Sequence, residues 1–162
     1  MPLLIRRAKP TDLAALTEEL GQRPYFTDRL TRQSDSKGVL LTAWLNNRPI
    51  GDAYLWLEEA EERPIRDHLP KAPLLTHVEI HPDYRNRGHG TKLITAAEEE
   101  LADLEHPLVA LAVERDNHDA MRLYHRLGYR EWAHPMVECL TFANDSGIRK
   151  PEICRVMVKH LS

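Results

Sequence analysis

The residues best suited to chemistry form one short loop, Arg85–Thr91. It precedes a segment whose apolar residues have helical spacing, so its two glycines fall at the first helical positions. There the backbone N–H groups have no partner within the helix, and a glycine lets a phosphate approach them without meeting a Cβ. The helix dipole and two arginines add positive potential, so the loop predicts an anion site. A glycine-rich turn with solvated arginines is the alternative that this segment alone leaves open. The residues of the site are Arg85, Asn86, Arg87, Gly88, His89, Gly90 and Thr91.

Two elements must hold this loop in place. Leu74–Ile80 is a predicted strand that ends at His81 and Pro82. The helix that begins near Gly88 has its apolar residues at Leu93, Ile94, Ala97, Leu101 and Leu104. The loop lacks the Gly-Lys-Ser/Thr ending of a nucleotide P-loop and the third glycine and distal acid of a dinucleotide-binding turn, so neither of those phosphate sites fits.

The remaining pattern predicts a single α/β domain that covers residues 1–162. Strands are expected at 3–7, 38–45, 50–57, 108–113, 129–142 and 152–159, and helices at 10–20, about 26–33 and about 117–127. Asn46–Pro49 and Asn144–Gly147 have the residue types of tight turns. Residues 58–73 are charged and contain three prolines, which predicts an exposed excursion with too little apolar content for a core.

The order of these features resembles the GNAT acetyltransferase superfamily. The resemblance rests on Arg85-x-x-Gly88-x-Gly90 after the strand, then on Asn117, Tyr124 and Leu127-Gly128-Tyr129. It is densest from Thr76 to Tyr129 and extends in kind to the whole chain. It implies a GNAT-like, mostly antiparallel, mixed twisted sheet with helices on both faces, splayed near Glu79 to admit a cofactor. One departure is His89, because the family usually has a small or branched apolar residue between the two glycines.

By the same resemblance the co-substrate is acetyl-CoA, and the reaction moves its acetyl group to an amine. The backbone at Val78 and Ile80 would pair with the pantetheine arm. The residues from Asn86 to Thr91 would hold the pyrophosphate, and Asn117 would brace the cofactor from the next helix. A non-catalytic module that binds acetyl-CoA or CoA as a sensor is the alternative function, and Tyr124 weighs against it.

Tyr124 is the candidate general acid for the departing thiolate. Asn117 and Tyr124 lie two helical turns apart, so they project from nearly the same face of the predicted helix. A phenol with a pKa of about 10 lies only ~1.5 units above a thiol at about 8.5, so modest tuning suffices. The family assigns this role to a tyrosine at the matching position. A core aromatic beside Leu123 and Leu127 is the alternative.

The general base is less determined by the sequence. Glu79 is the carboxylate within the central strand, and alternation places it opposite Val78 and Ile80. It could act directly or through a water molecule, whereas His77 or water alone could serve instead. A solvated or arginine-paired Glu79 is the structural alternative. His77, Glu79 and His81 share a strand face, but a fourth ligand cannot be named, so no metal is expected.

Composition limits the partners. The formal net charge is −3 and 42% of residues are hydrophobic, which predicts one core and no nucleic-acid partner. No stretch has the length of a signal or membrane-spanning segment, so we expect a cytoplasmic protein without a membrane partner. The two cysteines, Cys139 and Cys154, are expected to be reduced and packed as small hydrophobes.

The acceptor would be a small-molecule or peptide amine. An acidic run could attract it or be solvated, and comprises Glu58, Glu59, Glu61 and Glu62. Acceptor identity, an acyl group other than acetyl and a homodimer remain open.

Overall fold

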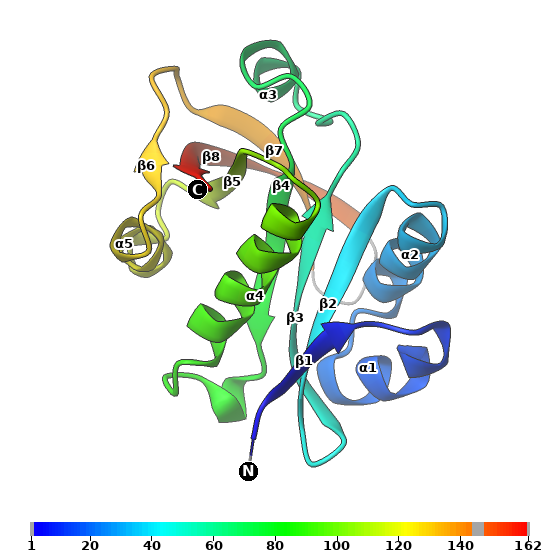
Figure 1. Cartoon of the computed structure of the whole chain (residues 1–162). Helices are drawn as coiled ribbons and strands as arrows, with labels where there is room; N and C mark the ends of the chain where they lie inside the picture. Colours follow the sequence, from blue (N-terminus) through cyan, green and yellow to red (C-terminus); the bar gives the residue numbers. More distant parts are fainter. Residues whose placement is uncertain (1, 144–147, 162) are drawn as a thin grey trace.

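The computed structural model describes residues 2–143 and 148–161 and shows alternating strands and helices (Figure 1). The strands are β1 (Leu4–Arg7), β2 (Gly38–Leu45), β3 (Arg48–Trp56), β4 (Leu74–Ile80), β5 (Leu108–Glu114), β6 (Arg130–Glu131), β7 (Val137–Ala143) and β8 (Ile148–His160). The helices are α1 (Leu13–Leu20), α2 (Arg23–Ser34), α3 (Arg63–His68), α4 (His89–Asp103) and α5 (His118–Arg126), with 3-10 turns at Pro10–Asp12 and Pro82–Tyr84.

The described strands form one sheet in the order β1-β2-β3-β4-β5-β8-β6, and β7 pairs with β8. Among the described strand pairs only β4 and β5 run parallel, so the sheet is mixed and mostly antiparallel. Helices cover both faces (Figure 1). The predicted fold class is therefore confirmed.

Side-chain alternation in β2 explains the two helix layers. Val39, Leu41 and Ala43 pack in the core cluster that contains the buried residues of α4. Leu40 points the other way and packs with Leu16 of α1 and with residues of α2. Because successive side chains of a strand point to opposite faces, α4 and the α1–α2 pair must cover opposite sides of the sheet.

The hairpin between β2 and β3 has a tighter turn than its four turn-forming residues suggest. Leu45 pairs with Arg48, which leaves two residues, Asn46 and Asn47, in the loop. Their φ angles are 51° and 66°, as in the type I′ turns that match the twist of adjoining strands. Asparagine tolerates this left-handed backbone better than most residues, so the local sequence sets the register of the hairpin.

Three sequence-based expectations need correction. Residues 58–73 are not merely an exposed excursion, since they contain α3, and Ile65 and Ala60 are 2% and 6% exposed in the core beneath it. Ile65 is the residue of this short helix that is buried in the core. The β segment expected over 129–142 is divided into β6 and β7, and α2 begins three residues early. The turn expected at Asn144–Gly147 lies outside the described residues.

Strand β4 departs from regular geometry in two ways. Its pairing with β3 passes from Tyr54 opposite Thr76 to Asp52 opposite Glu79, so two β4 residues, His77 and Val78, face one β3 residue. This is a β-bulge, and His77 has a φ of 53° there. Pairing of β4 with β5 is confined to Leu74 opposite Ala110. Beyond that point the two strands separate.

Candidate active site

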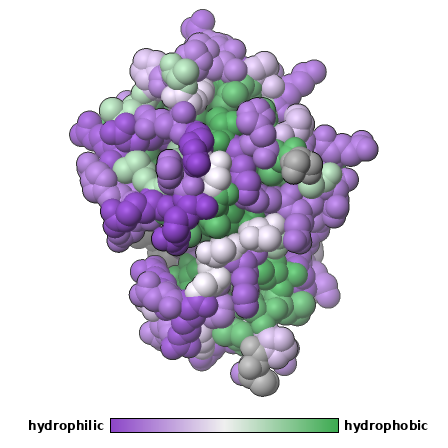
Figure 2. All heavy atoms as spheres, turned by 60° about the vertical axis from the view of Figure 1, so that its left-hand side comes forward, coloured by the Kyte–Doolittle hydropathy of each residue, from purple (hydrophilic) through white to green (hydrophobic). Residues whose placement is uncertain are grey.

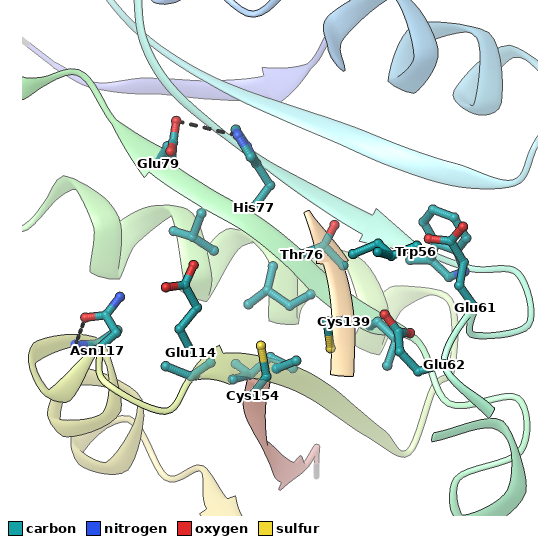
Figure 3. Close-up of a pocket in the computed structure, with 18 of the residues that line it drawn as sticks. Trp56, Glu61, Glu62, Thr76, His77, Glu79, Glu114, Asn117, Cys139 and Cys154 are labelled. Atoms are coloured by element: carbon teal, nitrogen blue, oxygen red, sulfur yellow. Dashed lines mark hydrogen bonds and ion pairs between the residues drawn. The ribbon is translucent and has the colours of Figure 1, made fainter. Parts of the chain in front are cut away.

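A cavity of about 530 Å³ opens where β4 and β5 separate. Its walls come from β4, β5, α5, the end of β3, residues of α1 and α2, α3 with the residues before it, and strands β7 and β8. In the close-up, Glu79 and His77 lie at one end, Glu61 and Glu62 at the other, and Cys139 and Cys154 between them (Figure 3). Both thiols are buried, as the sequence predicted. A cavity between the two strands has the size of a small-molecule site.

The loop Arg85–Thr91 lies at the N-terminus of α4, outside the lining of that cavity. Gly88 is the N-cap, with a φ of 80°. The first hydrogen bond of the helix runs from the Lys92 N–H to the Gly88 carbonyl oxygen. No partner among the described residues accepts from the backbone N–H groups between Asn86 and Thr91. A Cβ placed on Gly88 would meet no atom within 4 Å, and one on Gly90 would meet only Ile80, at 3.9 Å. The start of α4 is thus open to an anion.

The side chains of this loop are arranged unequally. Arg85 donates from Nε to the Ile80 carbonyl oxygen at 2.9 Å, which ties the loop to the end of β4. Arg87 lies over the Tyr84 ring, 5.8 Å from its centroid. Burial and the charges of Lys92 and Arg87 lower the pKa of His89. His89 is therefore a neutral ring beside the open N–H groups, and the positive charge there comes from its neighbours.

Helix α5 brings Asn117 and Tyr124 to the wall of the cavity. Asn117 is the N-cap, and its Oδ1 accepts from the Ala120 N–H at 3.2 Å, so its amide nitrogen keeps both donors for a ligand (Figure 3). Tyr124 is partly buried, with its ring edge-on to Tyr129 at 5.5 Å. Burial raises the pKa of Tyr124 to about 12. The phenol therefore stays protonated at neutral pH, with a larger gap to a thiol pKa than the sequence alone suggested.

Glu79 lies at the cavity on the far side of β4 from the core, whereas Val78 and Ile80 pack toward α4. Its side chain is 52% exposed, and Oε2 accepts from the Gln22 amide nitrogen at 3.0 Å. The same oxygen lies 3.5 Å from His77 Nε2 (Figure 3). A partly solvated carboxylate held in this way can accept a proton from a bound group or from a water molecule.

Sequence reasoning missed the residues that surround His77. Nδ1 of His77 lies 3.0 Å from Oδ2 of Asp52, and Nε2 lies 3.1 Å from Oε1 of Gln22. The Tyr25 ring stacks on the imidazole at 3.9 Å, and the Tyr25 hydroxyl donates to Asp52 at 2.9 Å. Asp52 is 1% exposed. A buried acid in a strand pattern was the available signal, because such groups need a partner.

The structure divides the acidic run of residues 58–62. Glu61 and Glu62 line the cavity, whereas Glu58 forms an ion pair with Arg32 at 2.6 Å. Glu59 is exposed, and its carbonyl accepts from the Trp56 indole. Glu114 of β5 adds a further carboxylate to the cavity wall. The face seen in Figure 2 is mostly hydrophilic, with patches of hydrophobic surface between the polar side chains.

The described residues contain neither a metal-binding cluster nor a membrane-spanning helix. In residues 2–143 and 148–161, no group of three or more His, Cys, Asp or Glu side chains is placed to hold a metal ion. Over the same ranges, no helix combines the length and apolar composition needed to cross a membrane.

The chain belongs to the acetyltransferase (GNAT) family, whose pattern matches residues 7–129. This confirms the resemblance inferred from the loop and the two helices. An uncharacterized N-acetyltransferase of Methanocaldococcus jannaschii is 29% identical over 112 residues, which are 67% of this chain and 45% of that protein. The chain therefore spans about half the length of this curated relative.

Solved structures share the fold over nearly the whole chain. The PaiA N-acetyltransferase of Thermoplasma acidophilum in complex with coenzyme A superposes with a TM-score of 0.71 and 17% identity, over 99% of each chain. The ribosomal-protein-S18-alanine N-acetyltransferase of Escherichia coli gives 0.70 and 18%, over 99% of this chain and 95% of that one. YncA, a putative acetyltransferase of Salmonella typhimurium with acetyl-CoA, gives 0.70 and 20%, over 100% and 95%. At these identities the likeness shows the fold alone.

Proposed function

We propose that this protein transfers the acetyl group of acetyl-CoA to an amine that enters the cavity between β4 and β5. The observation that carries this proposal is the separation of the two strands beyond Leu74. It leaves backbone N–H and C=O groups of β4 without a ladder partner in β5, and such groups need partners. An extended pantetheine arm would pair with them at Val78 and Ile80, as an added strand pairs with a sheet edge.

The pyrophosphate would bind at the start of α4. The open N–H groups from Asn86 to Thr91 supply the donors, and Arg87 and Lys92 supply the charge. Asn117 would brace the cofactor with its amide nitrogen, since its oxygen caps α5. Gly88 and Gly90 leave room for the phosphates to approach.

Tyr124 and Glu79 would share the proton transfers, because they reach the cavity from α5 and β4. The amine must lose a proton before or during its attack on the thioester carbon, and Glu79 accepts it directly or through water. The C–S bond then breaks, and Tyr124 gives its proton to the departing sulfur. The oxyanion between these steps would be stabilised by an unpaired N–H of β4. Both ring nitrogens of His77 face acceptors, which disfavours it as the base.

The acceptor would carry its amine past the carboxylates of the cavity. Glu61 and Glu62 lie at one end and Glu114 on the β5 wall, so the cavity attracts a cation before the amine loses its proton (Figure 3). A primary amine on a small molecule or a peptide fits this chemistry.

The experiment combines a panel of amines, a free-thiol readout and the substitution Tyr124→Phe. We expect at least one amine to release thiol, and Tyr124→Phe to lower kcat on the order of a hundredfold or more while calorimetric binding of CoA is unchanged. Tyr129→Phe is the matched control, since it removes a hydroxyl that donates to Glu98 and does not line the cavity. Tight CoA binding without thiol release from any amine would favour a sensor module. If the wild type did not bind CoA, both the acetyltransferase and the sensor function would be rejected.

A further inference from the structure

The hydrogen bonds of His77 determine its charge state. Its Nδ1 faces Oδ2 of Asp52 at 3.0 Å, and a carboxylate oxygen can only accept, so Nδ1 carries a proton. Its Nε2 faces Oε1 of Gln22 at 3.1 Å. An amide oxygen also only accepts, so the second nitrogen must carry a proton as well.

The orientation of the Gln22 amide has its own cause. Its nitrogen donates to Oε2 of Glu79 at 3.0 Å. If the amide were reversed to suit a neutral imidazole, its oxygen would face the Glu79 carboxylate and two acceptors would oppose each other. The arrangement that satisfies all three contacts has an imidazolium at His77, with Asp52 on one side and Gln22 and Glu79 on the other.

The same ring is attached to an unusual stretch of backbone. His77 has a φ of 53° at the bulge in β4, a conformation that histidine adopts only where its surroundings hold it. Those surroundings are the stacked ring of Tyr25 from α2 and the Asp52 carboxylate from β3, which also accepts from the Tyr25 hydroxyl. The contacts fix the imidazole from both neighbouring elements, and the fixed ring in turn holds the bulge.

We propose that His77 is a positioning residue whose imidazolium, locked by Asp52, holds the bulge of β4 and, through Gln22, aims the Glu79 carboxylate into the cavity. The kinetic part of this proposal rests on the proposed function, whereas the charge state and the bulge do not. Glu79 follows His77 by two residues and is otherwise half exposed, so it has little else among the described residues to fix its direction.

The charged and titratable groups that face His77 favour its protonated form. They are Asp52 from β3, Glu79 from β4, and Tyr25 and Arg29 from α2. Burial opposes the charge on the ring, and Arg29 opposes it too, but Asp52 and Glu79 outweigh both, so the pKa of His77 is raised. When His77 loses its proton at alkaline pH, Gln22 loses the donor that orients it and Glu79 is released. The activity should therefore fall on the alkaline side.

The substitution Asp52→Asn tests this proposal, because it keeps the shape of the side chain and removes its charge. In the wild type at neutral pH, ¹⁵N spectra of histidine should show both nitrogens of His77 protonated, and in Asp52→Asn they should show a neutral ring and a shifted Val78 amide. We expect kcat to fall on the order of a hundredfold, with KM for acetyl-CoA little changed. The alkaline limb of the kcat profile should move to lower pH.

Asp12→Asn is the matched control. Asp12 is also a buried carboxylate, bonded to Arg6 and to the Lys9 N–H, and it lies outside the cavity. The substitution Asp12→Asn should lower the free energy of unfolding without shifting the pH dependence of kcat. If Asp52→Asn and Asp12→Asn lost the same kcat, and neither changed the pH dependence of kcat, Asp52 would have only a structural role. That result would overturn the proposal.

His77→Asn separates the ring from the backbone, because asparagine accepts a positive φ. We expect it to fold and bind CoA, but to lose kcat as Asp52→Asn does and to lack the alkaline limb. Full activity in His77→Asn would mean that only the backbone conformation matters, and would overturn the proposal. A neutral His77 in the wild-type spectra would overturn it without any assay. If no amine is acetylated while those spectra show the imidazolium, only the proposed function fails.

Discussion

The two ends of β4 differ in what they pair with. At Leu74 the strand lies between β3 and β5, opposite Trp56 on one side and Ala110 on the other, and its side chain is 6% exposed. At Glu79, directly after the bulge, it pairs with β3 alone. The closed end is therefore buried in the core where the cavity begins, and the open end borders the cavity without a partner from β5.

This difference shows how one strand can be rigid and still offer backbone groups to a ligand. The ladder with β3 is continuous on both sides of the bulge, so β4 keeps its place in the sheet after it has left β5. A ligand can then bind along the edge of β4 that no longer pairs with β5, without disrupting the sheet. Substitutions at the open end should change catalysis or binding, and those at the closed end should change stability.

The largest expected effect is at the open end. Glu79→Gln keeps an acceptor for the Gln22 amide and removes the carboxylate that we propose as the base, so kcat should fall on the order of a hundredfold or more with KM for acetyl-CoA unchanged. Steady-state kinetics with a fixed amine measure both. Glu114→Gln is the comparison, since that carboxylate lies on the β5 wall of the same cavity. If Glu79→Gln and Glu114→Gln lost the same kcat, Glu79 would contribute only to the negative potential of the cavity and not to the proton transfer.

At the closed end, Leu55→Ala should cost about 2–5 kcal/mol of the free energy of unfolding, as cavities in well-packed cores do. Leu55 of β3 is fully buried, lies opposite Leu75 and does not line the cavity. Urea denaturation measures the loss, and calorimetry should find the CoA affinity of the folded protein unchanged. A variant that loses CoA affinity while remaining folded would show that the two ends are not independent.

A smaller effect is expected at the start of α4, beyond the open end. A Cβ at Gly90 would come no closer than 3.9 Å to an atom of another segment, and the branched side chain of valine would occupy the approach to the open N–H groups. Gly90→Val should weaken CoA binding about tenfold, the equivalent of one charge-assisted hydrogen bond. Thr95→Val, on the exposed part of the same helix, is the control. Unchanged CoA affinity in Gly90→Val would place the pyrophosphate elsewhere.

The smallest effect concerns stability against pH. The pKa of His77 is raised in the folded state above its unfolded value of about 6.5, so the stabilisation is complete below that value and is lost as pH rises through the folded pKa. The difference in the free energy of unfolding between the wild type and Asp52→Asn should therefore shrink as the pH rises above about 6.5. Urea denaturation across that range measures it. A constant difference would contradict the ion pair.

The local sequence was sufficient wherever nearby residues set the structure. The glycines at the start of α4, the helical spacing behind them and the paired asparagines of the first hairpin each act within a few residues, so their elements could be predicted. Prediction failed at residues 58–73, because the docking of α3 depends on the buried side of a sheet that is distant along the chain. It also failed where β6 and β7 divide, since the partner that sets their ends is β8.

The sequence by itself determined the family and the loop at the start of α4 that we propose as the anion site, together with the candidates Tyr124 and Glu79. Only the tertiary structure decided that His77 is held by Asp52 and Gln22, which are 25 and 55 residues away along the chain. The register that brings them together arises from the bulge in β4 and from the packing of α2 on the sheet. Hydrogen bonds at 3 Å depend on that long-range packing, and no local pattern of residue types encodes it.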